Sequence, residues 1–274
     1  MMIIPKIVHL TWYSKTLPNI FENIIQHNKK LNTDFEFKLW CEKPGPPEID
    51  NLLQNDYPDL YEIFLKCKYG VQKADIARIV FLYHFGGIYM DLDILTLKPL
   101  SELIDFNTNI AYLGMEPSEQ TTKVFNNPNI ICNAFMISPP KHPLFEKAIK
   151  NIKLLYVANK DKIFDVFNVF GADLLAHSIQ EDSVFQLCKF IDRKKIYPIN
   201  DLKFDDLSCS SNDVNMLKEG KYGDSHLVHY WIHSNFESKN LIDKFKCNEE
   251  EDINKNVYVF FKILYSSNKF LNPP

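Results

Sequence analysis

The sequence predicts an α/β protein in which helices flank a mixed central sheet. Short β-branched strands alternate with amphipathic helices through the first half of the chain, and one apolar helix ends at paired glycines before a further strand. The chain has 274 residues, of which 46% are hydrophobic, so it can fill one sizeable core. No internal repeat or linker interrupts the pattern, and we expect a single domain over residues 1–274.

The first elements follow from residue type and spacing. Residues 6–12 are β-branched and apolar, which favours a first, central strand. Pro18 opens a helix that is expected to run to about residue 30. Residues 35–41 alternate apolar with polar or charged side chains, which is the period of a second strand, and the proline-rich turn at 44–47 closes it.

The remaining elements are predicted in the same way. Apolar side chains recur at helical spacing in four further segments, about 48–54, 59–68, 71–85 and 142–158. Apolar runs predict strands at 110–114, 130–137 and 227–232. Residues 164–210 are predicted to be mostly helical, and an amphipathic helix is expected at about 253–270.

Two carboxylates follow the paired glycines. Gly86 and Gly87 end the third of these helices, and the short strand after them ends in Asp91 and Asp93. Side chains two apart in a strand share a face, so both carboxylates would reach one cation, with Leu92 in the core. A close like-charged pair calls for such a cation, and a hard divalent ion prefers oxygen ligands and recruits an anion such as a nucleotide diphosphate. The alternative is a solvated turn, which the apolar flanking residues disfavour.

Two further groups of residues are candidates for binding. Asp75 and Arg78 lie three apart on the helix that precedes the carboxylates, where they form either an ordinary surface ion pair or a buried ligand for phosphate or sugar hydroxyls. Trp12 ends the first strand, where an aromatic ring either stacks on a base or packs in the core.

A late cluster of imidazoles is the third candidate. His226, His229 and His233 fall within eight residues, with Trp231 and Ser234 among them. Imidazoles in such density can complete a metal site that distant carboxylates begin, although a single histidine is more often structural.

Composition excludes several classes of protein. The net charge is −4 and no long basic block occurs, which argues against nucleic-acid binding. Six scattered cysteines without a CxxC pair disfavour a zinc site or a disulfide scaffold, so we expect reduced thiols. No signal peptide and no uncharged apolar stretch of 18 residues is present, so we expect a cytoplasmic or membrane-peripheral protein without a transmembrane segment.

The motifs together resemble a known family. The sequence is similar to glycosyltransferase family 32, the DXD sugar-binding group that includes α-1,6-mannosyltransferases and capsular polysaccharide enzymes, and more distantly to the glucosylating domains of large clostridial toxins. The similarity runs from residue 4 to about 236, and the block around the two aspartates is its most specific part. The segments that carry it are residues 4–9 with Trp12, 74–78, 85–93, and 133–136 leading to 142–143.

The resemblance implies a GT-A fold with a Rossmann-like nucleotide-binding sheet and added C-terminal helices. It implies transfer of a hexose from a UDP- or GDP-linked sugar to a glycan or protein-linked acceptor, with retention of configuration and with Mn²⁺ or Mg²⁺, in polysaccharide biosynthesis. On this basis residues 1–115 would form the nucleotide-sugar half, 116–240 the acceptor side with the metal-closing segment, and 241–274 the C-terminal helix.

The resemblance also implies roles for individual residues. Asp93 would ligate the metal directly, and Asp91 would contact ribose and the metal shell. The catalytic set would be Asp75, Arg78, Asp91 and Asp93, with Asp75 and Arg78 holding the hydroxyls of the donor sugar. Donor-binding residues would be Trp12 on the base, Tyr89 in the nucleotide pocket, Asn133 and Ser234. The late segment departs from the family's Gly-Ser-Trp-like triplet, so whether His229, His233 or Ser234 completes the metal site stays open.

Two rival functions use similar motifs. Phosphohydrolases of the haloacid-dehalogenase type also carry a DxD, but they place Thr or Val where this chain has Leu95, and they usually carry the motif on their first strand. A non-catalytic module that binds nucleotide sugars would retain the same donor motifs.

Overall fold

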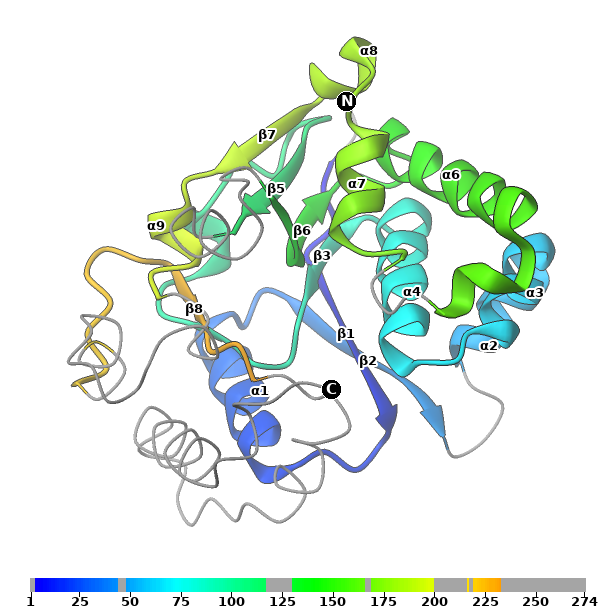
Figure 1. Ribbon diagram of the computed structural model, residues 1–274. Helices are drawn as coiled ribbons and strands as arrows, with labels where there is room; N and C mark the ends of the chain where they lie inside the picture. The colour runs from blue at the N-terminus through cyan, green and yellow to red at the C-terminus, as the bar shows by residue number, and fades with distance from the viewer. Residues whose placement is uncertain are drawn as a thin grey trace, which may run out of the picture.

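A mixed six-stranded sheet forms the centre of the protein (Figure 1). The structure is a computed structural model that describes residues 3–43, 48–116, 130–165, 169–199, 216 and 219–232. In sheet order the strands are β2 (Glu36–Lys43), β1 (Ile7–Ser14), β3 (Gly87–Met90), β6 (Ile131–Ser138), β5 (Ala111–Met115) and β7 (Cys188–Ile191). A separate two-stranded sheet pairs β4 (Ile94–Thr96) with β8 (Leu227–His229).

The strand directions divide the sheet into two parts. β1 runs parallel to both β2 and β3, so the carboxyl ends of these three strands meet at one edge. β6 runs antiparallel to β3 and β5, and β7 is parallel to β5. In open α/β sheets ligands bind outside the carboxyl ends of the strands. That edge is therefore where a site is expected.

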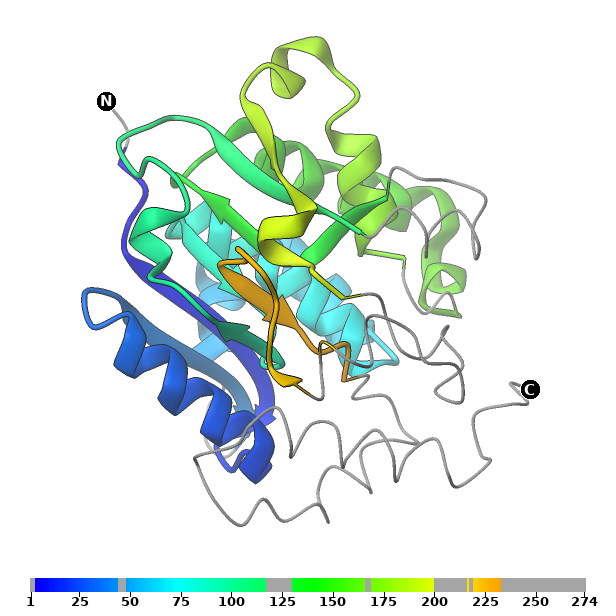
Figure 2. The same cartoon turned by 90° about the vertical axis from the view of Figure 1, so that its left-hand side faces the viewer.

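Helices cover both faces of the sheet, and Figures 1 and 2 show α1 on one side with α4 and α6 on the other. Val8 and Leu10 of β1 share one apolar core with α1, whereas Trp40 of β2 packs with α4 and α6 in a second core. The helices are α1 (Asn19–Leu31), α2 (Glu48–Asp56), α3 (Pro58–Lys66), α4 (Gly70–His84), η1 (Leu100–Glu102), α6 (Pro143–Asn159), η2 (Lys160–Asp165), α7 (Ala172–Ser178), α8 (Asp182–Phe185) and α9 (Arg193–Ile196).

The predicted α/β class with a mixed sheet is confirmed, and three expectations need correction. β3 ends at Met90, so Asp91 and Asp93 lie in a turn rather than at alternating strand positions. The segment 164–210, predicted to be mostly helical, contains β7, and the late strand ends at His229. β7 and β4 have only four and three residues, too few for a sequence period to reveal them. The predicted terminal helix at 253–270 lies outside the described residues.

None of the helices in the described ranges combines the length and apolarity that a membrane crossing needs.

Gly86 and Gly87 bring β3 close to β1. Their φ angles are +68° and +92°, a region that side chains with a Cβ rarely enter. A Cβ added at Gly87 would lie 2.5 Å from the carbonyl oxygen of Ile7, and one at Gly86 would lie 2.5 Å from the nitrogen of Pro140. The paired glycines are therefore a steric requirement for delivering the two aspartates to the sheet edge.

Replacing Gly87 with alanine should destabilise the fold. We expect Gly87→Ala to lower the free energy of unfolding by at least about 2 kcal/mol, because both strain and a backbone clash oppose it. Urea titration followed by circular dichroism measures this change. Gly70→Ala is the matched control, since Gly70 begins α4 with no atom within 4 Å of an added Cβ. Equal stability of the two variants would contradict the steric account.

Candidate functional site

A buried turn between β3 and β4 carries the two aspartates. The amide of Asp91 donates to the carbonyl of Ala134 on β6, and the amide of Ile94 donates to the carbonyl of Asp91, which closes the turn. Leu92 is buried as predicted, and Asp93 is only 6% exposed. The turn is thus part of the core rather than a solvated loop, although it is not the strand that the spacing predicted.

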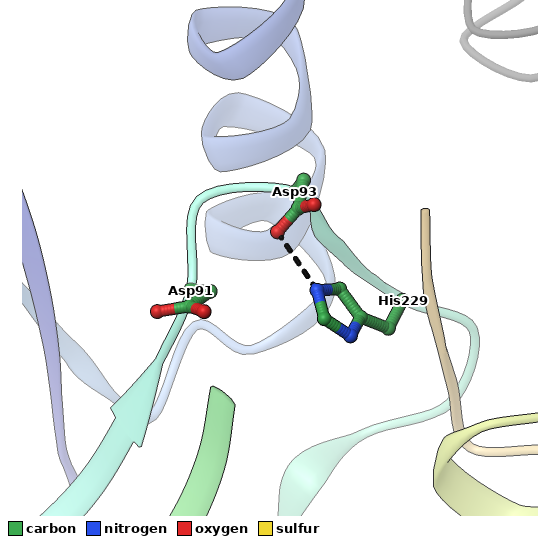
Figure 3. A group of neighbouring side chains, drawn as sticks. All are labelled: Asp91, Asp93 and His229. Carbon is green, nitrogen blue, oxygen red and sulfur yellow. Dashed lines mark ion pairs between the residues drawn. The ribbon is translucent and has the colours of Figure 1, made fainter. Parts of the chain in front are cut away.

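His229 reaches the turn from β8, the late strand (Figure 3). Ile94 pairs with His229 in the β4–β8 ladder, and the imidazole Nε2 lies 3.2 Å from Oδ1 of Asp93. The Ile232 amide donates to Oδ2 of Asp93 at 2.6 Å, and the Tyr230 amide donates to the Asp93 carbonyl at 3.0 Å. One aspartate therefore fixes a segment that lies far away in the sequence.

A strained residue shapes that segment. Trp231 has a φ of +54°, which is unusual for a bulky side chain and costs about 1–3 kcal/mol. Its indole Nε1 donates to the carbonyl of Ile199 at 3.1 Å, and its ring centroid lies 4.1 Å from that of His229. These contacts hold Trp231 in the conformation in which the next amide faces Asp93.

The donor set of the turn suits a divalent cation. Ligand atoms of Asp91, Asp93 and His229 all lie within 4.8 Å of one another. Two carboxylates and one imidazole fit Mn²⁺, and Mg²⁺ through the carboxylates. His226 is not part of this group, and His233 and Ser234 lie outside the described residues.

Asp75 and Arg78 of α4 form a buried pair next to the turn, not the surface pair that was the alternative. Arg78 Nη2 lies 3.5 Å from Oδ1 of Asp75 and 3.6 Å from Oδ1 of Asp91. The side-chain amide of Asn133 on β6 donates to Oδ1 of Asp75 at 2.9 Å, and the backbone carbonyl of Asn133 accepts from Arg78 Nη1 at 2.8 Å. One guanidinium thus lies between two carboxylates.

Tyr89 connects the turn to the first strand. Its hydroxyl donates to Oδ1 of Asp91 at 2.7 Å and is 3.1 Å from the hydroxyl of Thr11 on β1. The Arg78 guanidinium lies 4.5 Å from the centre of the Tyr89 ring. Tyr89 therefore orients Asp91 from within the core.

A cavity of about 470 Å³ opens over all of these groups. Trp12 lines it at the end of β1, with its ring centroid 5.3 Å from that of Phe21 of α1 in an edge-to-face contact. Its indole nitrogen is buried and has no hydrogen-bond partner among the described residues. The structure thus brings Trp12, Asp75, Arg78, Tyr89, Asp91, Asp93, Asn133 and His229 to one cavity.

Burial and neighbouring charges give the acids different protonation behaviour. Burial would raise the pKa of Asp93, but His229 and the Ile232 amide outweigh it, and the pKa of Asp93 is lowered. Burial likewise disfavours charge on His229, yet Asp93 holds the pKa of His229 well above its usual value. For Asp75, burial outweighs the attraction of Arg78 and raises the pKa to about 6. Burial also raises the pKa of Asp91, against the effect of Arg78.

Sequence reasoning missed three contributors to the cavity. Thr11 supports Tyr89, the Ile232 backbone amide binds Asp93, and the buried thiol of Cys132 lies in the cavity wall. The Ile232 amide could not be predicted, because nearly every residue has a backbone N–H and the residue type does not show which one binds a carboxylate. Cys132 directly precedes Asn133, the first residue of the 133–136 motif, and this neighbourhood was the signal that could have identified it.

A family model matches the part of the chain that carries the turn aspartates. The model described as glycosyltransferase sugar-binding region containing DXD motif matches residues 18–110, which include Asp75, Arg78 and both turn aspartates. Residues 18–110 are thus similar to the DXD sugar-binding region of these glycosyltransferases. The predicted resemblance is confirmed, and the named relatives support the prediction that the chain is a glycosyltransferase.

Named relatives and a solved structure agree with this class. Inositol phosphoceramide mannosyltransferase 1 of Schizosaccharomyces pombe is 28% identical over 69% of this chain, and the chain spans about half (52%) of that relative's length. Uncharacterized glycosyltransferase L373 of Acanthamoeba polyphaga mimivirus is 28% identical over 75% of this chain and 77% of its own. Apo-form glycosyltransferase GlyE of Streptococcus pneumoniae aligns with a TM-score of 0.50 at 12% identity, over 97% of this chain and 64% of its own, which supports the predicted GT-A fold.

Removing His229 should change how stability depends on pH. The folded-state pKa of His229 is raised, so its stabilising contribution is complete below the unfolded pKa of about 6.5 and is lost as pH rises towards the folded pKa. We expect His229→Gln to lower the free energy of unfolding by about 3 kcal/mol near pH 5.5, and by progressively less above pH 6.5.

Urea denaturation from pH 5 to 9 in the presence of EDTA measures this dependence. Exposed His177 on α7 provides the control variant His177→Gln, which should follow the wild-type profile. A constant difference between wild type and His229→Gln across the range would show that the ion pair with Asp93 does not supply the stability.

Proposed function

We propose that the protein is a metal-dependent, retaining glycosyltransferase that moves a hexose from a UDP- or GDP-linked sugar to a hydroxyl of a glycan or protein-linked acceptor. The observation that carries this proposal is the gathering of Asp91, Asp93 and His229 in a cavity that Trp12 and Arg78 also line. In such a donor the cation site would bind the diphosphate, the aromatic ring of Trp12 would stack on the base, and the guanidinium of Arg78 would bind the sugar.

The cation is proposed to be Mn²⁺ or Mg²⁺. Asp93 and His229 would hold it, and Asp91 would contact both its shell and the ribose. When bound, the cation stabilises the negative charge that develops on the departing diphosphate. The lowered pKa of Asp93 supports its role, because Asp93 is a carboxylate at all physiological pH values. His229 must lose its proton before it can act as a ligand, so Asp93 is the principal ligand.

The sugar is proposed to lie against Asp75 and Arg78. The guanidinium donates to hydroxyl oxygens, and the Asp75 carboxylate accepts from hydroxyl hydrogens, which together discriminate the orientation of neighbouring hydroxyls. Asn133 holds Asp75 through a 2.9 Å hydrogen bond and thereby sets the position of that acceptor. Tyr89 orients Asp91 in the same way, at 2.7 Å.

The reaction is proposed to proceed by front-face displacement. Asp75 is held between Asn133 and Arg78 and is therefore better placed to bind hydroxyls than to attack the anomeric carbon. The acceptor oxygen forms its bond to the anomeric carbon on the face from which the diphosphate departs. The bond between that carbon and the diphosphate oxygen breaks, and the acceptor's proton passes to the departing phosphate. The configuration of the sugar is retained.

Relatives suggest the class of sugar. Inositol phosphoceramide mannosyltransferase 1 is named for mannose transfer, which supports mannose as a hexose to test first. We place the activity in polysaccharide or glycoconjugate assembly, at a cytoplasmic or membrane-peripheral location.

The Asp93→Asn variant tests the metal dependence. We expect wild-type protein to release or transfer sugar from at least one UDP- or GDP-linked hexose when Mn²⁺ is present, and to lose this activity with EDTA. Asp93→Asn should lower the rate at least about 100-fold, because a metal ligand and its charge are lost. A panel of nucleotide sugars with detection of the free nucleotide measures this.

Asp182→Asn is the matched control, since Asp182 is exposed on α8 and the substitution removes the same charge. Equal loss in both variants would contradict the assignment of Asp93. Donor binding without turnover under any condition would favour the non-catalytic module, and phosphate release from simple phosphomonoesters would favour the phosphohydrolase.

The stereochemistry is tested separately. Proton NMR of the product formed from an α-linked donor should show the α-anomer. Where the product is the free sugar released to water, the spectrum is recorded at early times, before mutarotation. A β-anomer as first product, or a trapped covalent glycosyl-enzyme, would exclude front-face displacement.

A further inference from the structure

The short strand β4 lies between a strand and a helix. Within the described residues β4 pairs with a single strand, β8, and on that side the carbonyl of Asp93, just before β4, accepts from the Tyr230 amide at 3.0 Å. Backbone groups alternate between the two edges of a strand, so those of Ile94 and Thr96 point the other way, towards α1. This edge needs hydrogen-bond partners of its own, because buried backbone groups are rarely left unpaired.

Asn28 of α1 occupies this edge in place of a second strand. Its side-chain amide donates to the carbonyl of Ile94 at 2.7 Å. Its side-chain oxygen accepts from the backbone amide of Thr96 at 2.8 Å and from the hydroxyl of Thr96 at 2.9 Å. One carboxamide thus makes the two backbone hydrogen bonds that a neighbouring strand would make. Asn28 is 1% exposed and Thr96 is fully buried, so water does not compete for these bonds.

Two further side chains of α1 complete the contact. Nε2 of His27 lies 2.9 Å from the carbonyl oxygen of Thr96. The side-chain amide of Asn32 donates to the carbonyl of Asn28 at 2.8 Å and to the hydroxyl of Thr96 at 3.1 Å, and its oxygen accepts from the Leu100 amide at 2.6 Å. We call His27, Asn28 and Asn32 the β4 clamp. The clamp fixes β4 along its own axis, because a shift by one residue would turn these backbone groups to the other edge.

The position of β4 decides where two of the candidate cation ligands meet. Asp93 directly precedes Ile94, and His229 is the partner of Ile94 in the β4–β8 ladder. The 3.2 Å approach of the His229 imidazole to the Asp93 carboxylate depends on this register. A shift of β4 against β8 would carry the carboxylate away from the imidazole.

We propose that Asn28 is a positioning residue for the cation site, which acts through Ile94 to hold Asp93 beside His229. This rests on the proposed function, in which Asp93 and His229 hold Mn²⁺. Asn28 is not among the described residues that line the cavity. Any effect of Asn28 on the cation therefore reaches the site through β4.

A double-mutant cycle on Mn²⁺ affinity tests this. Electron paramagnetic resonance of free Mn²⁺ gives the dissociation constant, first with Mn²⁺ alone and then with UDP or GDP present. Asn28→Ala should weaken Mn²⁺ binding about tenfold, as the loss of groups that orient a metal ligand does. In the His229→Ala protein, which already lacks the imidazole, Asn28→Ala should change the affinity by less than about twofold.

Asn151→Ala is the matched control. Asn151 is a buried asparagine of α6, on the opposite face of the sheet from α1, and its side-chain amide donates to the Ser178 hydroxyl at 2.9 Å. Its replacement should destabilise the protein and leave the Mn²⁺ affinity unchanged. Circular dichroism in the near ultraviolet establishes that each variant is folded.

His27→Ala extends the test to a case in which Asn28→Ala does not fold. His27 is the partly exposed member of the β4 clamp, so its loss is easier to tolerate. It should weaken Mn²⁺ binding by about threefold, as expected for the loss of one hydrogen bond. Unchanged Mn²⁺ affinity in His27→Ala would contradict the clamp.

The outcomes separate the two levels of the proposal. If wild-type protein binds Mn²⁺ under neither condition, the proposed function itself fails. If Asn28→Ala and Asn151→Ala change the Mn²⁺ affinity equally, or if Asn28→Ala weakens it by the same factor with and without His229, the cation site stands. Positioning by Asn28 is then wrong, because the residue contributes only to the stability of the fold.

Discussion

The buried carboxylate of Asp93 is the group on which the geometry of the site depends. An ionised group this deeply buried is costly unless charge and hydrogen bonds compensate it, and Asp93 has both, from His229 and from the Ile232 amide. These partners come from a distant segment of the chain, in which Ile232 is 139 positions from Asp93. The need to satisfy one carboxylate thus fixes the position of β8 against β4. The strained conformation of Trp231 is a consequence, since it turns the chain so that the amide of Ile232 meets the acid.

Arg78 plays the corresponding role for the other acids. Asp75 and Asp91 both lie within 4 Å of its guanidinium, which also lies over the Tyr89 ring, 4.5 Å from the ring centre. The pKa values of the two acids are still raised, because burial disfavours their charged forms more than one shared guanidinium favours them. The site therefore carries more acidic than basic groups. Such an excess is what a divalent cation and hydroxyl groups of a ligand can satisfy.

The sequence was sufficient for the local part of this arrangement and not for the distant part. Residues 70–93 encode the helix, the paired glycines and the acids in one contiguous block. Spacing placed Asp75 beside Arg78 and Asp91 beside Asp93, and the resemblance to the family implied that the two pairs share a site. The turn was missed because β3 has only four residues, and a strand this short has no period that shows where it ends. The resemblance pointed to His229, His233 or Ser234 and left the choice among them open. The position of His229 beside Asp93 depends on the β4–β8 register, and β4 itself was not predicted. His233 stays a prediction.

The division of the ligand set between near and distant parts of the chain couples metal binding to folding. Asp91 and Asp93 belong to the β3–β4 turn, whereas His229 belongs to a strand whose ladder contains three residue pairs. A ligand that binds only the assembled set stabilises the assembled state in proportion to its affinity. In the proposed enzyme, cation binding and the docking of β8 therefore strengthen each other. Without the cation, the imidazolium of His229 supplies the positive charge that Asp93 requires, so the Asp93–His229 pair holds β8 against the turn in that state as well.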